Sequence, residues 1–301
     1  YNSVFAASRT AGQWWWEHAD NPAGPGEDML AFAGPRMIGH TGAIPLLFRY
    51  GERMVRMARL QHGFVHPDFQ RRGIFSEIVT QLTRRLAAEG ADMAVGFAHD
   101  GRHSMPGIMR SGAFQHVFDM FRWVRRFPVT GRMPPDLHIV TDDHVRFDTA
   151  DLRCAERLLA SCAIRNRRDP ACLNWRYHPA SGRRYAVSRV WRDEQLAGWV
   201  VVKPYTPAGS LDLVECILPP EPELVSAVLG ALAVRFRGAA LDRFTVWSME
   251  HYPLHACLTD LGFTAETRPT HVLTAPLSDR SSTSRIDPSA YYLAMGDSDV
   301  Y

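Results

Sequence analysis

The chain has 301 residues, of which 46% are hydrophobic. This length exceeds what one ordinary core needs, so we expect two globular domains. The 34 basic and 32 acidic residues leave a net charge of only +2, which gives no broad electrostatic reason to expect a nucleic-acid partner. Apolar runs are short and interrupted by Arg, Gly or Pro, so the sequence predicts no membrane span and no membrane partner.

The first half predicts helices and strands in an ordered succession. Apolar positions three or four residues apart favour helices, and apolar runs bounded by Gly, Pro or Asn favour strands. In chain order we expect a helix over 4–18, strands over 29–33, 37–47 and 52–65, a helix over 73–88, a strand over 93–98, a short helix over 104–109 and two last strands that end near 124. This mixture indicates an α/β protein.

The segment 64–86 joins a strand, a basic turn and a helix. The first N–H groups of a helix that begins near Gly73 lack intrahelical partners and point toward whatever lies in front of it. With the positive end of the helix dipole, they favour a phosphate or pyrophosphate. Gly73 lets the backbone approach the ligand closely, and Arg71 and Arg72 add positive charge. The segment therefore predicts an anion-binding site.

This segment resembles the acyl-CoA binding loop of the GNAT superfamily of N-acyltransferases. The signature of that loop is Gln or Arg, two residues, Gly, one residue, then Gly or Ala. Gln70 and Gly73 match it, whereas Phe75 departs from it and narrows the space beside the pyrophosphate. The order of elements over 13–127 also resembles a GNAT domain, which implies a mostly antiparallel sheet whose two central strands run parallel and splay apart.

The resemblance implies that acetyl-CoA, or another acyl-CoA, is the co-substrate. The positions that correspond to the cofactor-binding part of the family are Phe64, Val65, Gln70, Arg71, Arg72, Gly73, Ile74 and Phe75.

The second half repeats features of the first. Gly198 and Gly262 correspond to Gly39 and Gly112, which indicates a duplicated fold. We therefore expect two tandem GNAT-like domains, each with a central sheet flanked by helices. The expected limits are 1–130 for the first domain, 131–145 for a linker, 146–277 for a degenerate second domain, and 278–301 for a linker and docked tail.

We call the segment from Gln70 to Gly73 the phosphate loop. The second copy lacks the features of this loop. The helix expected over 224–236 follows a Pro-rich turn in which Glu221 and Glu223 place negative charge where phosphates would lie, and no Gly opens it. We expect only the first copy to bind CoA, while the second packs against it and shapes the acceptor pocket.

All five cysteines also lie in the second half, at spacings that match no common zinc or disulfide framework. They are Cys154, Cys162, Cys172, Cys216 and Cys257. We expect free thiols in a reducing cytoplasm and no metal cofactor.

Acyl transfer to an amine needs stabilisation of an oxyanion and removal of a proton. The resemblance implies that a backbone N–H at Phe64 or Val65 faces the thioester carbonyl. Relatives often carry a Tyr four residues before the Gly of a Gly-Phe pair as the acid for the leaving thiolate, but that position is Ile108 here. His99, at the end of a strand that flanks the cofactor gap, is a candidate catalytic or substrate-contacting residue, although such a His is also often structural.

The tail is aromatic and carries two carboxylates, so we expect it to dock. Asp297 or Asp299 is a candidate to bind or deprotonate the substrate ammonium. The alternative is a tail that only covers an apolar seam.

These patterns favour an N-acyltransferase that moves an acyl group from CoA to a primary amine of a small molecule, such as an amino sugar or a specialised metabolite, and acts as a monomer or homodimer. One alternative is a Fem-type aminoacyl transferase, which would not need a pyrophosphate loop. The other is a GNAT-like protein that binds CoA or another ligand without turnover, which the residue at Ile108 leaves open.

Overall fold

The computed structural model describes residues 9–99, 104–129, 133–278 and 287–298. The chain forms two compact units. The first unit consists of Tyr1–Asp119 and Arg268–Pro288, and the second unit of Met120–Thr267 and Ser289–Tyr301. Within the described ranges, no helix combines the length and the apolar character that a membrane crossing requires.

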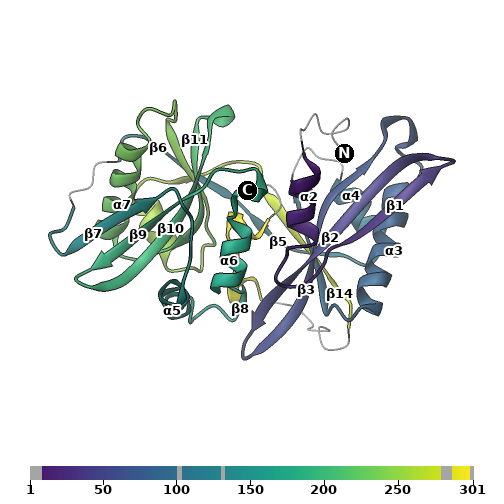
Figure 1. Ribbon diagram of the computed structural model, residues 1–301, viewed down its shortest axis with the longest axis horizontal. Helices are drawn as coiled ribbons and strands as arrows, with labels where there is room; N and C mark the ends of the chain where they lie inside the picture. The colour runs from purple at the N-terminus through teal and green to yellow at the C-terminus, as the bar shows by residue number, and fades with distance from the viewer. Residues whose placement is uncertain (1–8, 100–103, 130–132, 279–286, 299–301) are drawn as a thin grey trace. The chain divides into compact units, whose positions relative to one another are not determined.

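The first unit follows the expected order of elements (Figure 1). Its elements are α2 (Ala11–His18), β1 (Glu27–Ala33), β2 (Arg36–Tyr50), β3 (Arg53–Val65), η1 (Pro67–Phe69), α3 (Ile74–Ala88), β4 (Met93–His99), α4 (Ser104–Arg110), β5 (Gln115–Met120) and β14 (Thr270–Pro276). The strands lie in the order β1-β2-β3-β4-β14-β5. The predicted α/β class with a mixed sheet is confirmed.

The two central strands of this sheet are parallel and pair only briefly. The paired residues of β3 are Met57–Arg59, and those of β4 are Met93–Val95. From there β3 continues for six residues to Val65 and β4 for four residues to His99. The strands therefore diverge in the way that the resemblance implied, and we call the space between their ends the β3–β4 gap.

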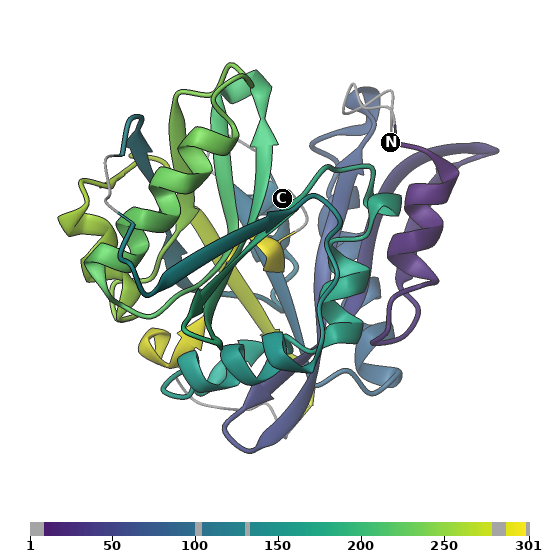
Figure 2. The same cartoon turned by 60° about the vertical axis from the view of Figure 1, so that its left-hand side comes forward.

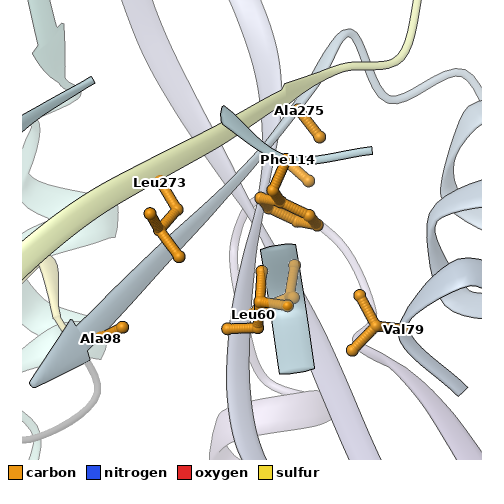
Figure 3. Packing of buried hydrophobic residues seen from close by; sticks show 8 residues of the cluster. Leu60, Val79, Ala98, Phe114, Leu273 and Ala275 are labelled. Atoms are coloured by element: carbon orange, nitrogen blue, oxygen red, sulfur yellow. The ribbon is translucent and has the colours of Figure 1, made fainter. Parts of the chain in front are cut away.

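One face of this sheet packs on α3. Apolar side chains from β3, α3, β4, α4, β14 and the turn before β5 gather there and form a buried cluster (Figure 3). Its members are Leu60, Val79, Ala94, Ala98, Ile108, Phe114, Leu273 and Ala275. The amphipathic helix places Val79 and Leu82, which are fully buried, on the sheet side. This packing fixes the start of α3 relative to the end of β3.

The second unit repeats this plan. Its elements are β6 (Arg122–Arg126), β7 (Leu137–Asp142), α5 (Thr149–Leu158), β8 (Ile164–Asn166), α6 (Pro170–Arg176), η2 (Pro179–Ser181), β9 (Ala186–Arg192), β10 (Gln195–Tyr205), η3 (Thr206–Ala208), β11 (Ser210–Ile217), α7 (Pro222–Arg235), β12 (Arg243–Trp247), α8 (Leu254–Asp260), β13 (Thr264–Ala265), η5 (Pro288–Ala290), β15 (Tyr291–Tyr292) and η6 (Met295–Asp297). Seven strands form a sheet in the order β13-β6-β12-β11-β10-β9-β7. Its central parallel pair is β11 with β12. Figure 2 shows the green strands of this sheet and the purple and blue strands of the first unit.

Each unit is completed by a strand from the other half of the sequence. β14 follows the second unit's strands along the chain, yet it pairs antiparallel with β4 over Thr270–Pro276. Conversely, β6 follows β5 and pairs antiparallel with β12. Both strands lie beside the second member of a central parallel pair. The limits 1–130 and 146–277 stay a prediction about the two copies, because the compact units cross them.

The pairing of β14 with β4 predicts that a core substitution in β14 destabilises the first unit. Leu273 is fully buried there, and Leu273→Ala should cost about 2–5 kcal/mol. Hydrogen exchange should show faster opening of β3 and β4. Leu213→Ala, a comparably buried control on β11, should open β11 and β12 instead. If hydrogen exchange in the Leu273→Ala variant became faster only in the second unit, the placement of β14 in the first unit would be contradicted.

Candidate active site

The loop after β3 exposes the start of α3. Gly73 caps the helix in the left-handed conformation, with a φ of 80°, and no side chain caps the first turn. Among the described residues, no heavy atom apart from those of its chain neighbours would lie within 4 Å of a Cβ at Gly73. The first N–H groups of a helix lack intrahelical partners, and no side chain caps those of α3. The start of α3 thus carries no side-chain cap, as the predicted anion site requires, and anion binding itself stays a prediction.

The loop is held by its own side chains. Gln70 Nε2 donates to the Val65 carbonyl at 3.0 Å, and Arg72 donates to the Asp68 carbonyl at 3.0 Å. The guanidinium of Arg72 also lies over the Phe69 ring, 5.2 Å from its centroid. Gln70 thus braces the loop to the last residue of β3.

A second arginine lies against the same ring. Arg36, from β2, has its guanidinium 5.9 Å from the Phe69 centroid and an Nη 2.7 Å from His66 Nε2. Arg36 and Arg72 therefore both bring positive charge to the Phe69 ring in the loop that leads to α3.

Phe75 fills space between β3 and α4. A Cβ at Gly63 would lie 2.7 Å from the Phe75 ring, and one at Gly107 would lie closer still. Ser76 Oγ donates to the Gly107 carbonyl at 3.0 Å, which holds α4 against α3. The departure from the family signature is thus accommodated by two glycines that leave room for the ring.

β3 contains a bulge just before its end. In the register with β2, Gln61 pairs with Gly42 and Phe64 pairs with His40, so two residues of β3 oppose one of β2. The first of these, His62, has a φ of 55°. This left-handed conformation costs a residue with a side chain about 1–2 kcal/mol.

The bulge decides which N–H group faces the β3–β4 gap. The N–H of His66 donates to the Ile38 carbonyl of β2 at 2.7 Å. Because successive N–H groups of a strand point to opposite edges, the N–H of Val65 points away from β2, toward the gap, and that of Phe64 points to β2. Val65 therefore has the orientation that its predicted role requires, and the role itself stays a prediction.

A buried polar cluster lies on the face of the sheet opposite α3. Glu17 and His18, at the end of α2, contact Arg59 and Gln61 of β3, which alternate with Leu60 of the α3-side core. We call this group the α2-face cluster. Its members are Glu17, His18, Asp28, His40, Arg59, Gln61 and His62.

Glu17 is ionised in this cluster. His62 Nε2 donates to Glu17 Oε2 at 2.9 Å, and Arg9 forms an ion pair with the same carboxylate. An Nη of Arg59 lies 3.5 Å from Glu17 Oε1. Burial alone raises the pKa of Glu17, but the hydrogen bond from His62 and the nearby positive charges outweigh it, so its pKa lies well below the usual range.

Asp28 links two histidines on the same face. His40 Nε2 lies 2.7 Å from Asp28 Oδ1, and His18 Nδ1 lies 3.4 Å from Oδ2. Burial raises the pKa of Asp28, but the His40 hydrogen bond and the two imidazoles bring it below its usual value. Burial lowers the pKa of His18 despite Asp28. His18 therefore favours its neutral form.

The α2-face cluster was not predicted from the sequence. Its residues come from α2 and three strands, and the partners Glu17 and His62 lie 45 residues apart. One local signal was available, since His40 and His62 each lie beside glycines on strands that were expected to be neighbours. A glycine next to a polar residue within a strand often marks a bulge or a close backbone approach.

His99 has a partner within the first unit. It ends β4, and its Nδ1 lies 2.8 Å from Thr270 Oγ1 of β14. This contact is sufficient to explain its orientation structurally. A catalytic role for His99 stays a prediction.

Asp297 is buried in the second unit, and Asp299 lies outside the described residues. The Asp297 side chain accepts from Arg168 at 2.7 Å, from Asn166 Nδ2 at 3.0 Å and from the Ala294 N–H at 2.9 Å. These donors account for its burial as a docked tail residue. The predicted contact of either carboxylate with a substrate ammonium is not tested by this geometry.

The tail lies where β11 and β12 diverge. Residues 292–294 line a small cavity with Leu213 of β11 and Val246 of β12. Arg176 donates to the carbonyls of Gly296, at 2.6 Å, and Ser298, at 3.0 Å. The second unit thus carries its own tail at the position that corresponds to the β3–β4 gap.

Two carboxylates share one arginine beneath this tail. Arg168 donates to Asp297 at 2.7 Å but to Glu215 at 3.2 Å and 3.3 Å, and Tyr177 Oη also donates to Glu215. Burial raises the pKa of Glu215 to about 7, against the pull of Arg168. The nearby Asp297 carboxylate adds to this rise in the pKa of Glu215.

A group that could hold a metal ion lies at β5 and β14. Asp119 Oδ1 accepts from His116 and from His271, each at 2.7 Å. Burial raises the pKa of Asp119, but the bonds from His271 and His116 lower it overall. These hydrogen bonds explain the arrangement without an ion, and the absence of a metal cofactor stays a prediction.

A family model matches the N-terminal part of the sequence. Residues 1–115 match the family model for the acetyltransferase (GNAT) domain. This match confirms the resemblance that the Gln70–Gly73 loop carried. No curated protein matches the sequence.

Solved structures share the fold across both units. A tandem GNAT protein from the clavulanic acid biosynthesis pathway has 16% identity and a TM-score of 0.63, with 92% of each chain covered. A probable N-acyltransferase from Enterococcus faecalis V583 has 13% identity and a TM-score of 0.63, with 91% of this chain and 67% of that one covered. A GCN5-related N-acetyltransferase from Anabaena variabilis has 11% identity and a TM-score of 0.62, and 83% of this chain spans only 62% of its length. These likenesses confirm the predicted tandem fold.

Docking of the tail predicts intolerance of a methyl group at Gly296. A Cβ there would lie 2.8 Å from Glu215 Oε1 and closer to Tyr177 Oη. Gly296→Ala should therefore cost about 1–3 kcal/mol or more and release the tail to limited proteolysis. Gly238→Ala, with no heavy atom within 4 Å, is the control. Equal resistance of both variants would show that the tail is not docked as described.

The raised pKa of Glu215 predicts a pH-dependent stability. The folded chain keeps this proton up to about pH 7, whereas an unfolded Glu releases it near 4.5. Since the folded state binds more protons in between, this group's contribution falls as the pH rises from about 4.5 to 7. Glu215→Gln removes the effect, so urea unfolding should show the variant gaining relative to the wild type between pH 5 and pH 8. A difference that does not change with pH would exclude this titration.

Proposed function

We propose that this chain, a GNAT-superfamily protein with a tandem GNAT fold, transfers an acyl group from CoA to a primary amine of a small molecule, with acetyl-CoA as the default donor. The family match covers residues 1–115, which contain every element of the proposed CoA site. The acceptor class, an amino sugar or an amino group on a specialised metabolite, is part of the proposal.

The observation that carries the proposal is the coincidence of the phosphate loop with the β3–β4 gap. The pyrophosphate of CoA would bind the uncapped N-terminus of α3 at Gly73, with Arg71 and Arg72 as counter-charges. The thioester arm would enter the gap, where the N–H of Val65 points. Both features lie at the end of β3, so one ligand can use both.

The reaction would be a direct transfer. The neutral amine attacks the thioester carbonyl, so a C–N bond forms while the C–S bond breaks. The N–H of Val65 would donate to the oxyanion that develops on the carbonyl oxygen. The amine's proton leaves to a base or water, and the CoA thiolate takes a proton from solvent, since Ile108 cannot supply one. His99, Asp297 and Asp299 remain the candidates from the sequence for the proton-accepting role.

The second unit would not bind CoA in this way. α7 begins with Pro222, its N-cap is Glu221, and Glu223 lies in its first turn. Glu221 forms an ion pair with Arg192. The negative charge at this helix start disfavours a phosphate, and the docked tail lies between the diverging strands. Its proposed contribution is to support the first unit.

The two alternatives differ in what they require. A Fem-type aminoacyl transferase needs no pyrophosphate loop, so the geometry at Gly73 would be unused. A binding protein without turnover would keep the loop and lose the chemistry, and Ile108 is the feature in its favour. Titration with acetyl-CoA followed by a thiol-release assay on an amine panel separates all three.

The decisive comparison places a glutamate at either end of α3. Gly73 and Gly90 both have a φ of 80° and open space at the Cβ, so Gly73→Glu and Gly90→Glu carry similar backbone strain and equal charge. By calorimetry, Gly73→Glu should weaken acetyl-CoA binding at least about 10-fold by charge repulsion, whereas Gly90→Glu should stay within about 2-fold.

Three outcomes decide between the functions. Lack of acetyl-CoA binding by the wild-type chain would refute the proposal. Binding without thiol release across the panel would favour the non-catalytic alternative. Equal loss of affinity in both glutamate variants would show that the N-terminus of α3 is not the phosphate site.

A further inference from the structure

The β3 bulge shifts the alternation of the strand just before the gap. Before it, Leu60 faces the α3-side core and Gln61 faces the α2-face cluster. After it, Gly63 faces Phe75 on the α3 side, and the Phe64 ring lies by His40, 5.7 Å away between centroids. Because β3 contains one extra residue, the positions that would face α3 after the bulge face the α2-face cluster instead, and the reverse. Without the bulge, the N–H of Val65 would point toward β2 instead of the gap.

The bulge residue is held from two sides. His62 Nε2 donates to Glu17 Oε2 at 2.9 Å, and the carbonyl oxygen of His62 lies 3.0 Å from His40 Nδ1. The second nitrogen of His40 lies 2.7 Å from Asp28 Oδ1. The two ring nitrogens of His40 therefore each lie against an oxygen, one on the bulge residue and one on β1.

These contacts oppose a conformational cost. A left-handed His at position 62 is disfavoured by about 1–2 kcal/mol, and such strain persists only where surrounding contacts over-determine it. The α2-face cluster supplies those contacts from α2 through Glu17, from β1 through Asp28 and from β2 through His40. The charged side chains of the α2-face cluster are costly to remove from water. Their position around β3, just before the gap, points to a role in the site.

We propose that Glu17 and His40, with Asp28 behind His40, are positioning residues that hold the His62 bulge so that the N–H of Val65 points at the acyl carbonyl. This inference rests on the proposed acyl transfer and deepens it. None of the three needs to touch the substrate. They act through the backbone of β3, which carries the hydrogen-bond donor.

The sharpest test compares two variants, each of which keeps an amide nitrogen at the position of only one ring nitrogen of His40. The amide nitrogen of Asn corresponds to Nδ1 and can still donate to the His62 carbonyl, whereas that of Gln corresponds to Nε2 and keeps only the bond to Asp28. We expect His40→Asn to retain kcat within about 3-fold of the wild type. His40→Gln should lose about 10- to 100-fold, since loss of one oxyanion donor costs up to about 10²–10³. Acetyl-CoA affinity should stay within about 3-fold in both.

An infrared measurement supplies a readout that needs no acceptor. With acetyl-CoA labelled with ¹³C at the thioester carbonyl as the probe, the bound C=O stretch should shift to lower frequency in the wild type and in His40→Asn. In His40→Gln it should return toward the value of the free probe. The kcat values are measured with the amine that gives the fastest thiol release.

A second pair of variants guards against unfolding. His62→Val places a β-branched residue in the left-handed conformation, and Asp193→Val does the same in the β9–β10 turn, where φ is 51°. Both variants carry the same kind of backbone strain, and His62→Val also removes the donor to Glu17. Among variants that remain folded, only His62→Val should lower kcat and abolish the carbonyl shift.

The outcomes separate this inference from the proposed function. Acetyl-CoA binding by the wild type with no carbonyl shift overturns the inference alone, as does a folded His40→Gln variant with wild-type kcat and shift. Absence of acetyl-CoA binding by the wild type overturns the proposed function, and the inference falls with it.

Discussion

The divergence of β3 from β4 is the constraint on which the candidate site depends. Beyond Arg59 and Val95 the strands no longer pair, and backbone groups at an inner sheet edge must find other partners. Gln70 satisfies the Val65 carbonyl, which ties the phosphate loop to the strand end. The adjacent N–H of Val65 is oriented toward the same gap. One break in the sheet thus sets both the loop position and the direction of a donor.

Buried polar networks occupy comparable places in the two units but have different consequences. In the first unit, ion pairs and hydrogen bonds of Glu17 and Asp28 surround a strained strand. In the second unit, Arg168 holds Asp297 and thereby the tail where the central strands diverge. Buried charges cost desolvation energy unless they are well paired. In the second unit, the chain's own tail therefore lies where the central strands diverge.

Much of the fold followed from local patterns, and the errors of omission have a common cause. The helix predicted over 73–88 is Ile74–Ala88, and the one predicted over 224–236 is Pro222–Arg235, because apolar spacing and turn residues act over a few positions. The exchange of β6 and β14 and the α2-face cluster depend on contacts between distant segments. No spacing in one sequence reports such contacts directly.

The amino-acid sequence by itself determined the glycine at the start of α3, the duplicated order of elements and the acidic start of α7. Each of these depends on residues that are neighbours in the chain, such as Gly73 at a helix start or Glu221 before another. The tertiary structure decided which strands complete each unit, that Phe75 lies between two glycines, and that the bulge at His62 turns Val65 toward the gap. These outcomes depend on side chains that meet only after the sheets have formed, so packing and pairing across the fold determine them.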